Sequence, residues 1–393
     1  MTTLRTGGAG TLRVAVVGFG WMGQVHTRAY SRLLHHYPGT ALRPQLVAVA
    51  DPAPARRDLA TSSYGFARAQ ADWEQVVSSD DVDAVSVCGP NSVHRDVAVA
   101  AAEAGKHVWV EKPAGRHLAD TTEIAAAVRA AGVRSAVGFN YRNAPAVELA
   151  RELVAEGRIG GVETAAVRLL SDYSADPSGA LSWRFDPELA GTGVLGDLAS
   201  HGFDLVSYVL GSDGRIAEVI GDSATFIASR PRATGPVSHF STAAGGPLGP
   251  VGNEDYISAL MRFDSGARGS IESSRVAVGE QCTYALEVRG ERGALRWDFR
   301  RMGELAVCVD QGYSDAAWQT RYVGAGVGEL AAFQPGAGVA LGYDDLKVIE
   351  AERFVRSVAT GEPVGATIED AVTSASVIEA LVRSVDERRW VAV

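Results

Sequence analysis

The sequence predicts an α/β protein with two domains: an N-terminal doubly wound parallel sheet and a C-terminal α+β domain with a large open mixed or antiparallel sheet. Its 393 residues are too many for one hydrophobic core. From Leu12 to Asn140, short apolar runs alternate with helical patterns, which indicates parallel strands joined by helical crossovers. After Asn140, strand-like runs follow one another directly. We therefore expect a disordered tail at 1–11, a first domain at 12–140 and a second domain at 141–393.

The strands of the first domain are short runs of mainly apolar residues. In chain order they are LRVAVVG, QLVAVAD, DAVSVCG, HVWVEKP and VRSAVGFN. Helical patterns separate them: Gly23 to Leu34, ARRDLATSSYG, VHRDVAVAAAEAG and LADTTEIAAAVRAAG. Gly105 is placed to end the third of these helices. In a doubly wound sheet the ligand site is expected at the carboxyl ends of the strands.

The second domain begins with predicted strands and ends with predicted helices. ETAAVRLLSDY, ISALMRFDSGARGSIESSR and YALEVRGERGALRWDF predict strands, the last two as pairs joined by SG and RG turns. The segment from Arg230 to Gly252, rich in Gly, Pro and Ser, predicts a long loop. DDLKVIEAERFVRSVATGEP and TIEDAVTSASVIEALVRSV predict two helices. No helix follows RGSIESSRVAV and YALEVRG to cover their apolar residues, which favours a homodimer or homotetramer assembled through the open sheet face.

Composition excludes several classes of partner. Lys and Arg number 37 and Asp and Glu number 47, so the net charge of −10 disfavours nucleic acid. No apolar run approaches 18 residues, so we expect no membrane span. The three cysteines lack metal-ligand spacing, and the first residues lack the apolar segment of a signal peptide. We expect a cytoplasmic protein without a bound metal.

A glycine motif follows the first strand. Gly18, Gly20 and Gly23 form GxGxxG in VAVVGFGWMGQVH, where they allow a tight turn, close approach of a pyrophosphate and close helix–strand packing. The helix N-terminus after them favours phosphate, so Phe19, Trp21 and Met22 are expected beside the dinucleotide. Asp51 ends the second strand and is placed to bind the adenosine ribose. This favours NAD in a Rossmann domain, while Arg56 and Arg57 leave NADP open.

Three further motifs carry a family resemblance: CGPNSVH (88–94), VEKPAG (110–115) and GDLASHGFD (196–204). Together with GFGWMG they resemble the glucose–fructose oxidoreductase/inositol dehydrogenase/MocA-like family over nearly the whole chain. SADPSGALSWRF and GPVGNEDY resemble the branch that contains levoglucosan dehydrogenase. The resemblance implies that Lys112, Asp197 and His201 form the catalytic group, and that the Lys112–Pro113 bond is cis. Gly89 stands where the family commonly has a hydroxyl residue, which puts one cofactor contact in doubt.

The chemistry of these residues suits hydride transfer between a ring secondary hydroxyl of a sugar, anhydrosugar or inositol and nicotinamide. Such a reaction needs a base for the hydroxyl proton and a positive group beside the developing alkoxide. His201 is the expected base and Lys112 the expected cation. Asp197 precedes His201 by one helical turn, so it can orient His201, pair with Lys112 or hold a substrate hydroxyl. Asp204 continues the same helix side, either for the site or for a structural contact.

The remaining candidate residues lie at strand ends or resemble family positions. Asn140, Tyr141 and Arg142 follow the last strand of the first domain and are expected to line the sugar pocket, with Tyr141 the best candidate to stack against the substrate. Lys112, Asp197 and His201 are also expected to bind substrate. His94 is as well explained by packing, His26 is expected to be a packing residue, and Cys88 is expected to be buried and inert. The full set of expected cofactor-binding residues is Gly18, Phe19, Gly20, Trp21, Met22, Gly23, Asp51, Pro90, Asn91, His94, Glu111, Lys112, Asn140, Trp183 and Arg184.

Two other functions fit the same fold. An NAD-dependent glycosidase would oxidise its substrate transiently and recycle tightly held NAD. A non-enzymatic dinucleotide sensor would bind the cofactor without turnover, although the retention of Lys112, Asp197 and His201 argues against it.

Overall fold

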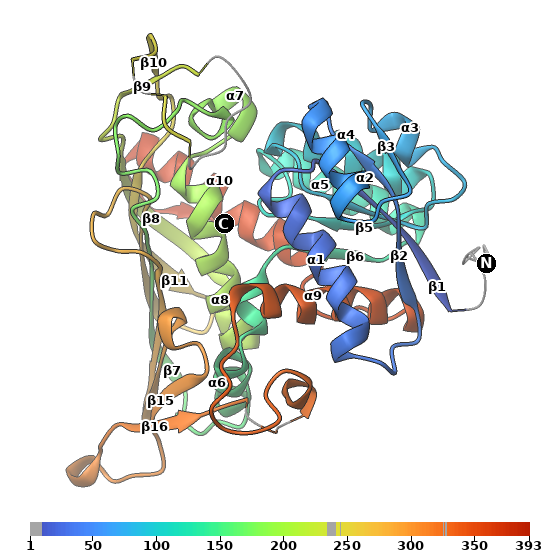
Figure 1. The fold of residues 1–393 in the computed structure, drawn as a ribbon. Helices are drawn as coiled ribbons and strands as arrows, with labels where there is room; N and C mark the ends of the chain where they lie inside the picture. The colour runs from blue at the N-terminus through green and yellow to red at the C-terminus, as the bar shows by residue number, and fades with distance from the viewer. Residues whose placement is uncertain (1–9, 234–240, 244, 325, 327) are drawn as a thin grey trace. The chain divides into compact units, whose positions relative to one another are not determined.

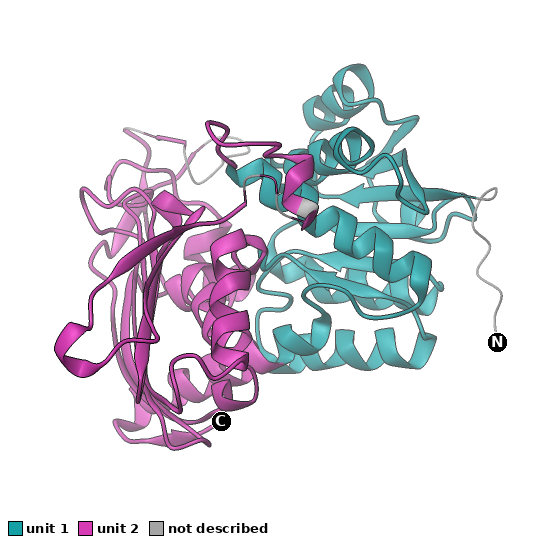
Figure 2. Cartoon of the chain, turned by 90° about the horizontal axis from the view of Figure 1, so that it is seen from below, with its two compact units in different colours: residues 1–140, 342–372 teal, residues 141–341, 373–393 magenta. Residues whose placement is uncertain are grey.

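The computed structural model describes residues 10–233, 241–243, 245–324, 326 and 328–393 (Figure 1). The predicted disordered tail lies outside the described residues except for Gly10 and Thr11. The first strand begins at Thr11, one residue before the predicted position. The chain divides into two compact units, one of residues 1–140 and 342–372 and the other of residues 141–341 and 373–393 (Figure 2).

The first unit contains a six-stranded sheet in the order β3-β2-β1-β4-β5-β6, with every neighbouring pair parallel. This order reverses direction between β1 and β4, which is the point where doubly wound sheets bind ligands. The predicted doubly wound sheet is confirmed. Its strands are β1 (Thr11–Val17), β2 (Arg43–Ala50), β3 (Arg68–Gln70), β4 (Ala84–Val87), β5 (His107–Val110) and β6 (Ser135–Val137).

Four of the connecting helices, α1, α2, α4 and α5, match the predicted helical patterns, whereas strand β3 and helix α3 were not predicted. β4 and β5 are buried along their whole length, as is typical of strands covered on both faces. Gly132 ends α5 in the left-handed conformation with φ of 68°, and Pro54 begins α2. The helices are α1 (Trp21–His36), α2 (Pro54–Ser63), α3 (Glu74–Val77), α4 (Asn91–Glu103) and α5 (Leu118–Ala131).

One segment departs from the predicted domain division. Residues 342–372, expected in the second domain, belong to the first unit. They contain α9 (Tyr343–Thr360), which packs along α1, and the start of α10 (Ile368–Glu387). Ala366, Ile368 and Ala371 join the hydrophobic core of the first unit, so buried apolar contact and not chain order decides where this segment folds.

The second unit contains a nine-stranded mixed sheet in the order β16-β15-β14-β13-β7-β12-β11-β8-β17. Only the β7–β12 pair is parallel, and the other neighbours run antiparallel. This confirms the predicted open mixed sheet. The strands are β7 (Val162–Leu170), β8 (Ile216–Ala224), β11 (Tyr256–Phe263), β12 (Arg268–Ser274), β13 (Thr283–Gly290), β14 (Gly293–Asp298), β15 (Glu304–Cys308), β16 (Gln319–Tyr322) and β17 (Val391–Ala392).

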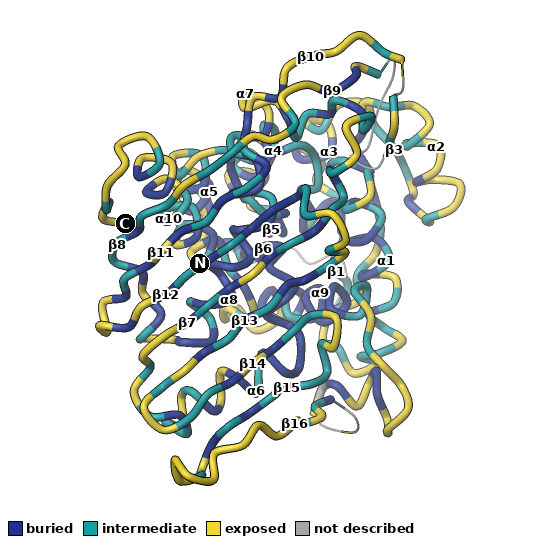
Figure 3. The backbone as a smooth tube through the Cα atoms, turned by 90° about the vertical axis from the view of Figure 1, so that its left-hand side faces the viewer, coloured by how far each residue is buried: buried dark blue, intermediate teal, exposed yellow. Residues whose placement is uncertain are grey.

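Burial alternates along the central strands of this sheet (Figure 3). The buried face includes Val167, Leu169 and Ile271, which pack under α8 (Ser200–Leu210), while α6 (Pro145–Ala155) contacts β14 and β15. The other face carries residues of intermediate or high exposure, such as Leu260, which is 54% exposed. The alternation therefore fixes which side chains of each strand enter the core.

Two local structures differ from the sequence prediction. The expected long loop around Arg230–Gly252 contains a short antiparallel pair, β9 (Ser229–Pro231) with β10 (Leu248–Pro250), and residues 234–240 and 244 of that loop lie outside the described part of the chain. The helix expected over the GDLASHGFD motif begins as a π-helical turn, Leu195–Ala199, and continues as α8. Asp197 and His201 therefore lie on two different helical geometries, which shifts Asp197 from the regular α-helical stripe.

Candidate active site

The glycine motif forms the connection from β1 to α1 in the first unit. Gly18 has φ of 89°, and a Cβ there would lie 2.5 Å from the backbone nitrogen of Gly89. A Cβ on Gly23 would lie 2.1 Å from the carbonyl oxygen of Gly18, so this glycine allows the helix to approach the strand. At Gly20 the nearest neighbour of such a Cβ is the Arg56 guanidinium, 4.0 Å away. The motif thus has a tight turn, a close helix contact and an open position between them.

The N-terminus of α1 suits an anionic group. Gly20 is the N-cap and has no side chain to cap the helix, and the first turn contains no acidic residue. The backbone N–H groups there and the positive end of the helix dipole are what a pyrophosphate binds. Phe19 itself is fully buried against Tyr64 and Phe66, so its contribution to a cofactor would come from its backbone.

Asp51 lies at the end of β2 and is 2% exposed. Its carboxylate accepts hydrogen bonds from the backbone N–H of Phe19 and of Ala53, both at 2.8 Å. Arg56 lies 3.4 Å from the same carboxylate and is about one-third exposed. Asp51 therefore ties the glycine loop to β2 and places a carboxylate beside it, while Arg56 brings a cation to the same place.

After β4, Pro90 and Asn91 stand at the start of α4, whereas His94 packs inside the first unit. Pro90 caps α4, and Asn91, its first residue, is buried. His94 is 1% exposed, with its ring nitrogens 2.9 Å from the carbonyl oxygens of Pro113 and Gly89. These contacts are those of the packing alternative, so we assign His94 to holding two loops together. Burial lowers the pKa of His94 and raises that of the Cys88 thiol.

Lys112 follows β5, and its peptide bond to Pro113 is cis, as the family resemblance implies. Glu111 directly before it is 5% exposed. The Glu111 carboxylate contacts the Lys347 ammonium at 2.6 Å and His26 at 2.9 Å, so any contact of Glu111 with a cofactor would use its backbone. Lys347 was not among the residues that sequence reasoning selected, because it lies on α9 with no recognisable motif around it.

The second unit brings an acid and an imidazole together with aromatic rings. The Tyr173 hydroxyl donates to the Asp197 carboxylate, and Arg184 Nε lies 3.8 Å from the same group. His201 is 5% exposed, and its ring packs edge to face with Tyr141 at 4.6 Å between ring centres. Burial and the neighbouring Asp197 carboxylate raise the pKa of Tyr173, so its hydroxyl remains a hydrogen-bond donor.

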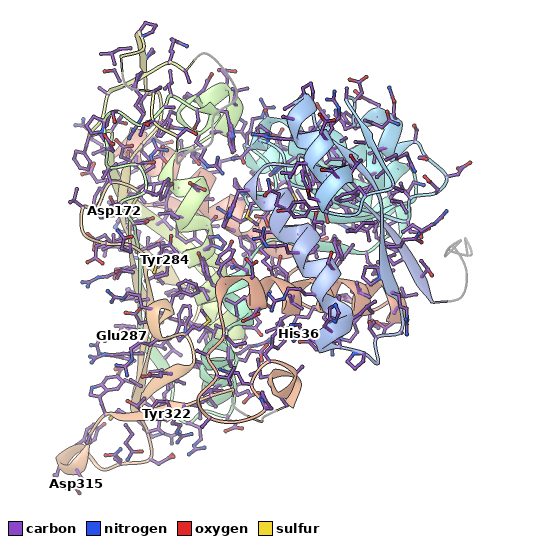
Figure 4. All side chains as sticks on the ribbon, in the orientation of Figure 1. His36, Asp172, Tyr284, Glu287, Asp315 and Tyr322 are labelled. Atoms are coloured by element: carbon purple, nitrogen blue, oxygen red, sulfur yellow. The ribbon has the colours of Figure 1, made fainter. Side chains whose placement is uncertain are left out.

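Tyr141 lies in an aromatic cluster on the same unit. Its ring is 5.1 Å from that of Tyr284, on β13 and labelled in Figure 4, and 4.9 Å from that of Phe299. The sequence motifs pointed to Tyr141 but not to Tyr284, Phe299 or Tyr173. Tyr173, Tyr284 and Phe299 each stand at an end of a predicted strand segment, so the strand predictions were the signal that could have found them.

Asp204 has a structural partner. Its carboxylate forms a buried, two-pronged ion pair with Arg142, whose Nε donates to Asp204 Oδ2 at 3.0 Å. The Arg142 guanidinium also lies 4.6 Å from the ring centre of Tyr208. The expectation that Arg142 lines a sugar pocket is therefore not supported by its contacts, because its guanidinium binds the Asp204 carboxylate and packs on the Tyr208 ring.

Trp183 and Arg184 form a stacked pair, with the guanidinium 4.4 Å from the indole ring. The carbonyl oxygen of Arg184 accepts a hydrogen bond from Asn253 Nδ2 at 2.8 Å, and Asn253 in turn accepts from the buried Arg275. Both residues of the pair are half-buried. The Arg184 side chain also lies beside Asp197.

The described residues fit a dinucleotide. The open glycine position, the uncapped start of α1 and the Asp51 carboxylate lie together in the first unit. Asn140 Nδ2 is buried and has no hydrogen-bond partner among the described residues, as expected of an amide that serves a ligand. The described residues contain no cluster of three His, Cys, Asp or Glu side chains suited to a metal, and no described helix is long and apolar enough to span a bilayer.

Comparison with known proteins gives one consistent result. The family model described as an oxidoreductase family with an NAD-binding Rossmann fold matches residues 12–139, and the GFO/IDH/MocA C-terminal domain matches residues 147–296. Levoglucosan dehydrogenase of Pseudarthrobacter phenanthrenivorans is 34% identical over 97% of this chain and 98% of its own. Inositol 2-dehydrogenase of Rhizobium meliloti is 27% identical over 98% and 99% of the two chains. A solved levoglucosan dehydrogenase in complex with NADH and levoglucosan aligns with a TM-score of 0.90 at 32% identity, covering 98% of this chain and 99% of that one.

Proposed function

The chain belongs to the GFO/IDH/MocA family of NAD-binding oxidoreductases, and from this premise we propose that it oxidises a ring secondary hydroxyl of an anhydrosugar, sugar or inositol with NAD. The substrate class rests on the relatives named as levoglucosan and inositol dehydrogenases. The observation that carries the proposal is that one helical segment of the second unit bears both the Asp197 carboxylate, which accepts from Tyr173, and His201, which packs against Tyr141. Apolar ring faces and adjacent polar groups are what a sugar ring requires.

In this reaction the bound nicotinamide supplies the hydride acceptor. His201 takes the proton of the substrate hydroxyl, since a neutral imidazole is a suitable base near pH 7. Asp197, held by Tyr173 and Arg184, keeps a negative charge that favours the imidazolium formed. Lys112 supplies positive charge for the alkoxide, and Tyr141 stacks against the sugar ring.

The test is a panel of polyols with purified protein. Levoglucosan, L-sorbose, myo-inositol and scyllo-inositol are each incubated with NAD or NADP, and the absorbance of reduced cofactor is followed. We expect NADH formation with at least one of them. Binding of NAD without reduction by any substrate would contradict the proposal and favour a sensor, whereas recycled, tightly held NAD would favour a glycosidase.

Variants then assign the catalytic residues. His201→Ala should lower kcat by roughly 10²–10⁴ and leave NAD affinity nearly unchanged. Lys112→Ala should lower kcat as well, and the double variant should lose less than the product of the two effects, because the residues share one transition state. The exposed His35 provides the control, since His35→Ala should keep the kcat of the parent. A His201→Ala enzyme with unchanged kcat would refute this mechanism.

We further propose a cytoplasmic homodimer or homotetramer, assembled through the face of the nine-stranded sheet opposite α8. Support comes from exposed apolar residues on that sheet, such as Leu260, and from three cysteines that form no disulfide. Sedimentation at micromolar concentration should give a mass of two or four chains, and a monomer would contradict this assembly.

A further inference from the structure

Lysine is rare in this chain, and one of its lysines is fully buried. The sequence contains three lysines, Lys106, Lys112 and Lys347, against 34 arginines. Lys347 lies on α9 and is 0% exposed. A buried ammonium is retained only where hydrogen bonds and opposite charges compensate for lost hydration.

Two carboxylates and an indole ring surround Lys347. Its Nζ lies 2.6 Å from Glu111 Oε1 and 3.0 Å from Glu350 Oε1. Trp109 Nε1 donates to the same oxygen of Glu350 at 2.8 Å, and the ammonium lies 5.6 Å from the centre of the Trp109 ring. Trp109 and Glu111 share one face of the chain because side chains alternate along a strand. β5 and the residue directly after it thus present an indole and a carboxylate to α9.

The charges of this network follow from its contacts. A carboxylate only accepts hydrogen bonds, so His26 donates through Nε2 to Glu111 and stays neutral; burial lowers its pKa to about 4. The Lys347 ammonium holds the pKa of Glu111 well below its usual range in spite of burial. Burial raises the pKa of Glu350 to about 7. Glu111 is therefore the ionised partner of Lys347 at neutral pH.

Glu111 connects the Lys347 ammonium to the backbone of Lys112 at the end of β5. Its Oε2 accepts the backbone N–H of Lys112 at 3.3 Å, and its own N–H donates to Val87 in β4 at 2.9 Å. The carboxylate is seated so closely on Gly138 that a Cβ there would lie 2.5 Å from Oε1. α1, α9, β4 and the end of β6 together hold the residue that precedes Lys112.

We propose that Lys347 is a positioning residue: through the Glu111 carboxylate it fixes the backbone from which Lys112 projects. The proposal rests on the proposed function for the role of Lys112, but not for the geometry. Removal of the ammonium leaves a buried carboxylate with no cation, which must take up a proton or move away from the Lys112 N–H. A displacement of about 1 Å at a catalytic group lowers turnover by about 10²-fold.

The test is a cycle of Lys347→Met, Glu111→Gln and the double variant. If Lys347 acts through Glu111, Lys347→Met should lower kcat by about 10²-fold with the KM for NAD nearly unchanged, and should have little further effect in the Glu111→Gln background. Arg13→Met is the matched control, because it breaks the ion pair of Arg13 with Asp83 in the same unit, at the opposite ends of the strands. Arg13→Met should lower the thermal midpoint and keep kcat.

The second measurement needs no turnover. Reductive methylation with ¹³C-formaldehyde labels the accessible lysines, and a Lys106→Arg variant assigns the two side-chain signals, since Lys347 is buried. In Lys347→Met and in Glu111→Gln, the Lys112 signal should shift or split, whereas in Arg13→Met it should not. An unchanged signal with unchanged kcat would overturn the proposal. Independent, multiplicative losses in the double variant would also overturn it, because Lys347 would then act by another route. If no polyol is oxidised, the proposed function fails, but the Lys112 signal still shows whether Lys347 positions Lys112. If Lys347→Met does not fold, the Lys112 signal in Glu111→Gln still tests the same proposal.

Discussion

At the scale of single residues, two acids that share a sequence motif have different tasks. Asp197 and Asp204 both lie in GDLASHGFD, yet Asp197 contacts Tyr173 and Arg184, whereas Asp204 is paired with Arg142 and is 4% exposed. The partner of each carboxylate, and not its place in the motif, decides whether it serves chemistry or stability. This difference can be measured.

Asp204→Asn should lower the free energy of unfolding far more than it lowers kcat. The substitution leaves the Arg142 guanidinium buried without its counter-charge, which costs about 3–5 kcal/mol. We expect a lower free energy of unfolding in urea, with kcat of the folded enzyme changed only a few-fold. Asp222→Asn, at an exposed position on β8, should change neither quantity. A large loss of kcat with unchanged stability would instead place Asp204 in the substrate site.

Asp51→Ser should narrow the preference for NAD over NADP. The carboxylate disfavours a 2′-phosphate, and Arg56 beside it would then face the phosphate unopposed. Because Asp51 also accepts the Phe19 N–H and so holds the glycine loop on β2, the substitution should lower the stability of this loop and weaken the binding of NAD as well. Calorimetric titration of both cofactors checks the prediction, and tighter binding of NADP to the parent protein would refute it.

At the scale of elements, α8 positions His201 because a glycine follows it. A Cβ at Gly202 would lie 2.6 Å from Leu169 Cδ1, 2.8 Å from Ile271 Cδ1 and 2.9 Å from Val167 Cγ1. These three residues belong to the buried face of the nine-stranded sheet. The helix can therefore lie close to β7 and β12 only if residue 202 has no side chain.

Gly202→Ala should destabilise the protein even though alanine is the better helix former. The gain in helix propensity is about 1 kcal/mol, and overpacking of a filled core costs about 1–3 kcal/mol. We expect a net loss in urea unfolding of up to about 2 kcal/mol. We also expect a fall in kcat, because α8 must move away from the sheet and carries His201 with it. A variant more stable than the parent would contradict this prediction, because the three side chains would then move aside with no loss of stability.

At the scale of the whole molecule, buried neutral histidines make stability depend on pH. Burial lowers the pKa of His26 and of His107 to about 4, and the Nδ1 of His107 accepts the backbone N–H of Arg134. Below about pH 6.5 these histidines are protonated in the unfolded chain but remain neutral in the folded chain. Their contribution to the free energy of unfolding is therefore present above pH 6.5 and is lost as pH falls towards 4. Glu350 acts in the opposite sense, because its raised pKa of about 7 favours the folded state as pH falls from 7 to 4.5.

His107→Gln should remove one part of this dependence. Between pH 7 and pH 5 the parent should lose about 2 kcal/mol through His107, and the variant should not, because glutamine does not titrate. Urea unfolding at the two pH values measures the difference. His35→Gln, at an exposed position, should leave the pH dependence as it is in the parent.

Local sequence patterns determined the two sheet types, the glycine loop, the strand end at Lys112 and the helix with Asp197 and His201, since periodicity and glycine chemistry act over a few residues. Only the tertiary structure decided that Arg142 neutralises Asp204, that Tyr173 holds Asp197, and that residues 342–372 return to the first unit. It also paired Glu111 with a lysine 236 positions away. The partner of a buried charge is the opposite charge that tertiary packing places next to it. That partner depends on contacts between distant segments, which no local pattern of residues encodes.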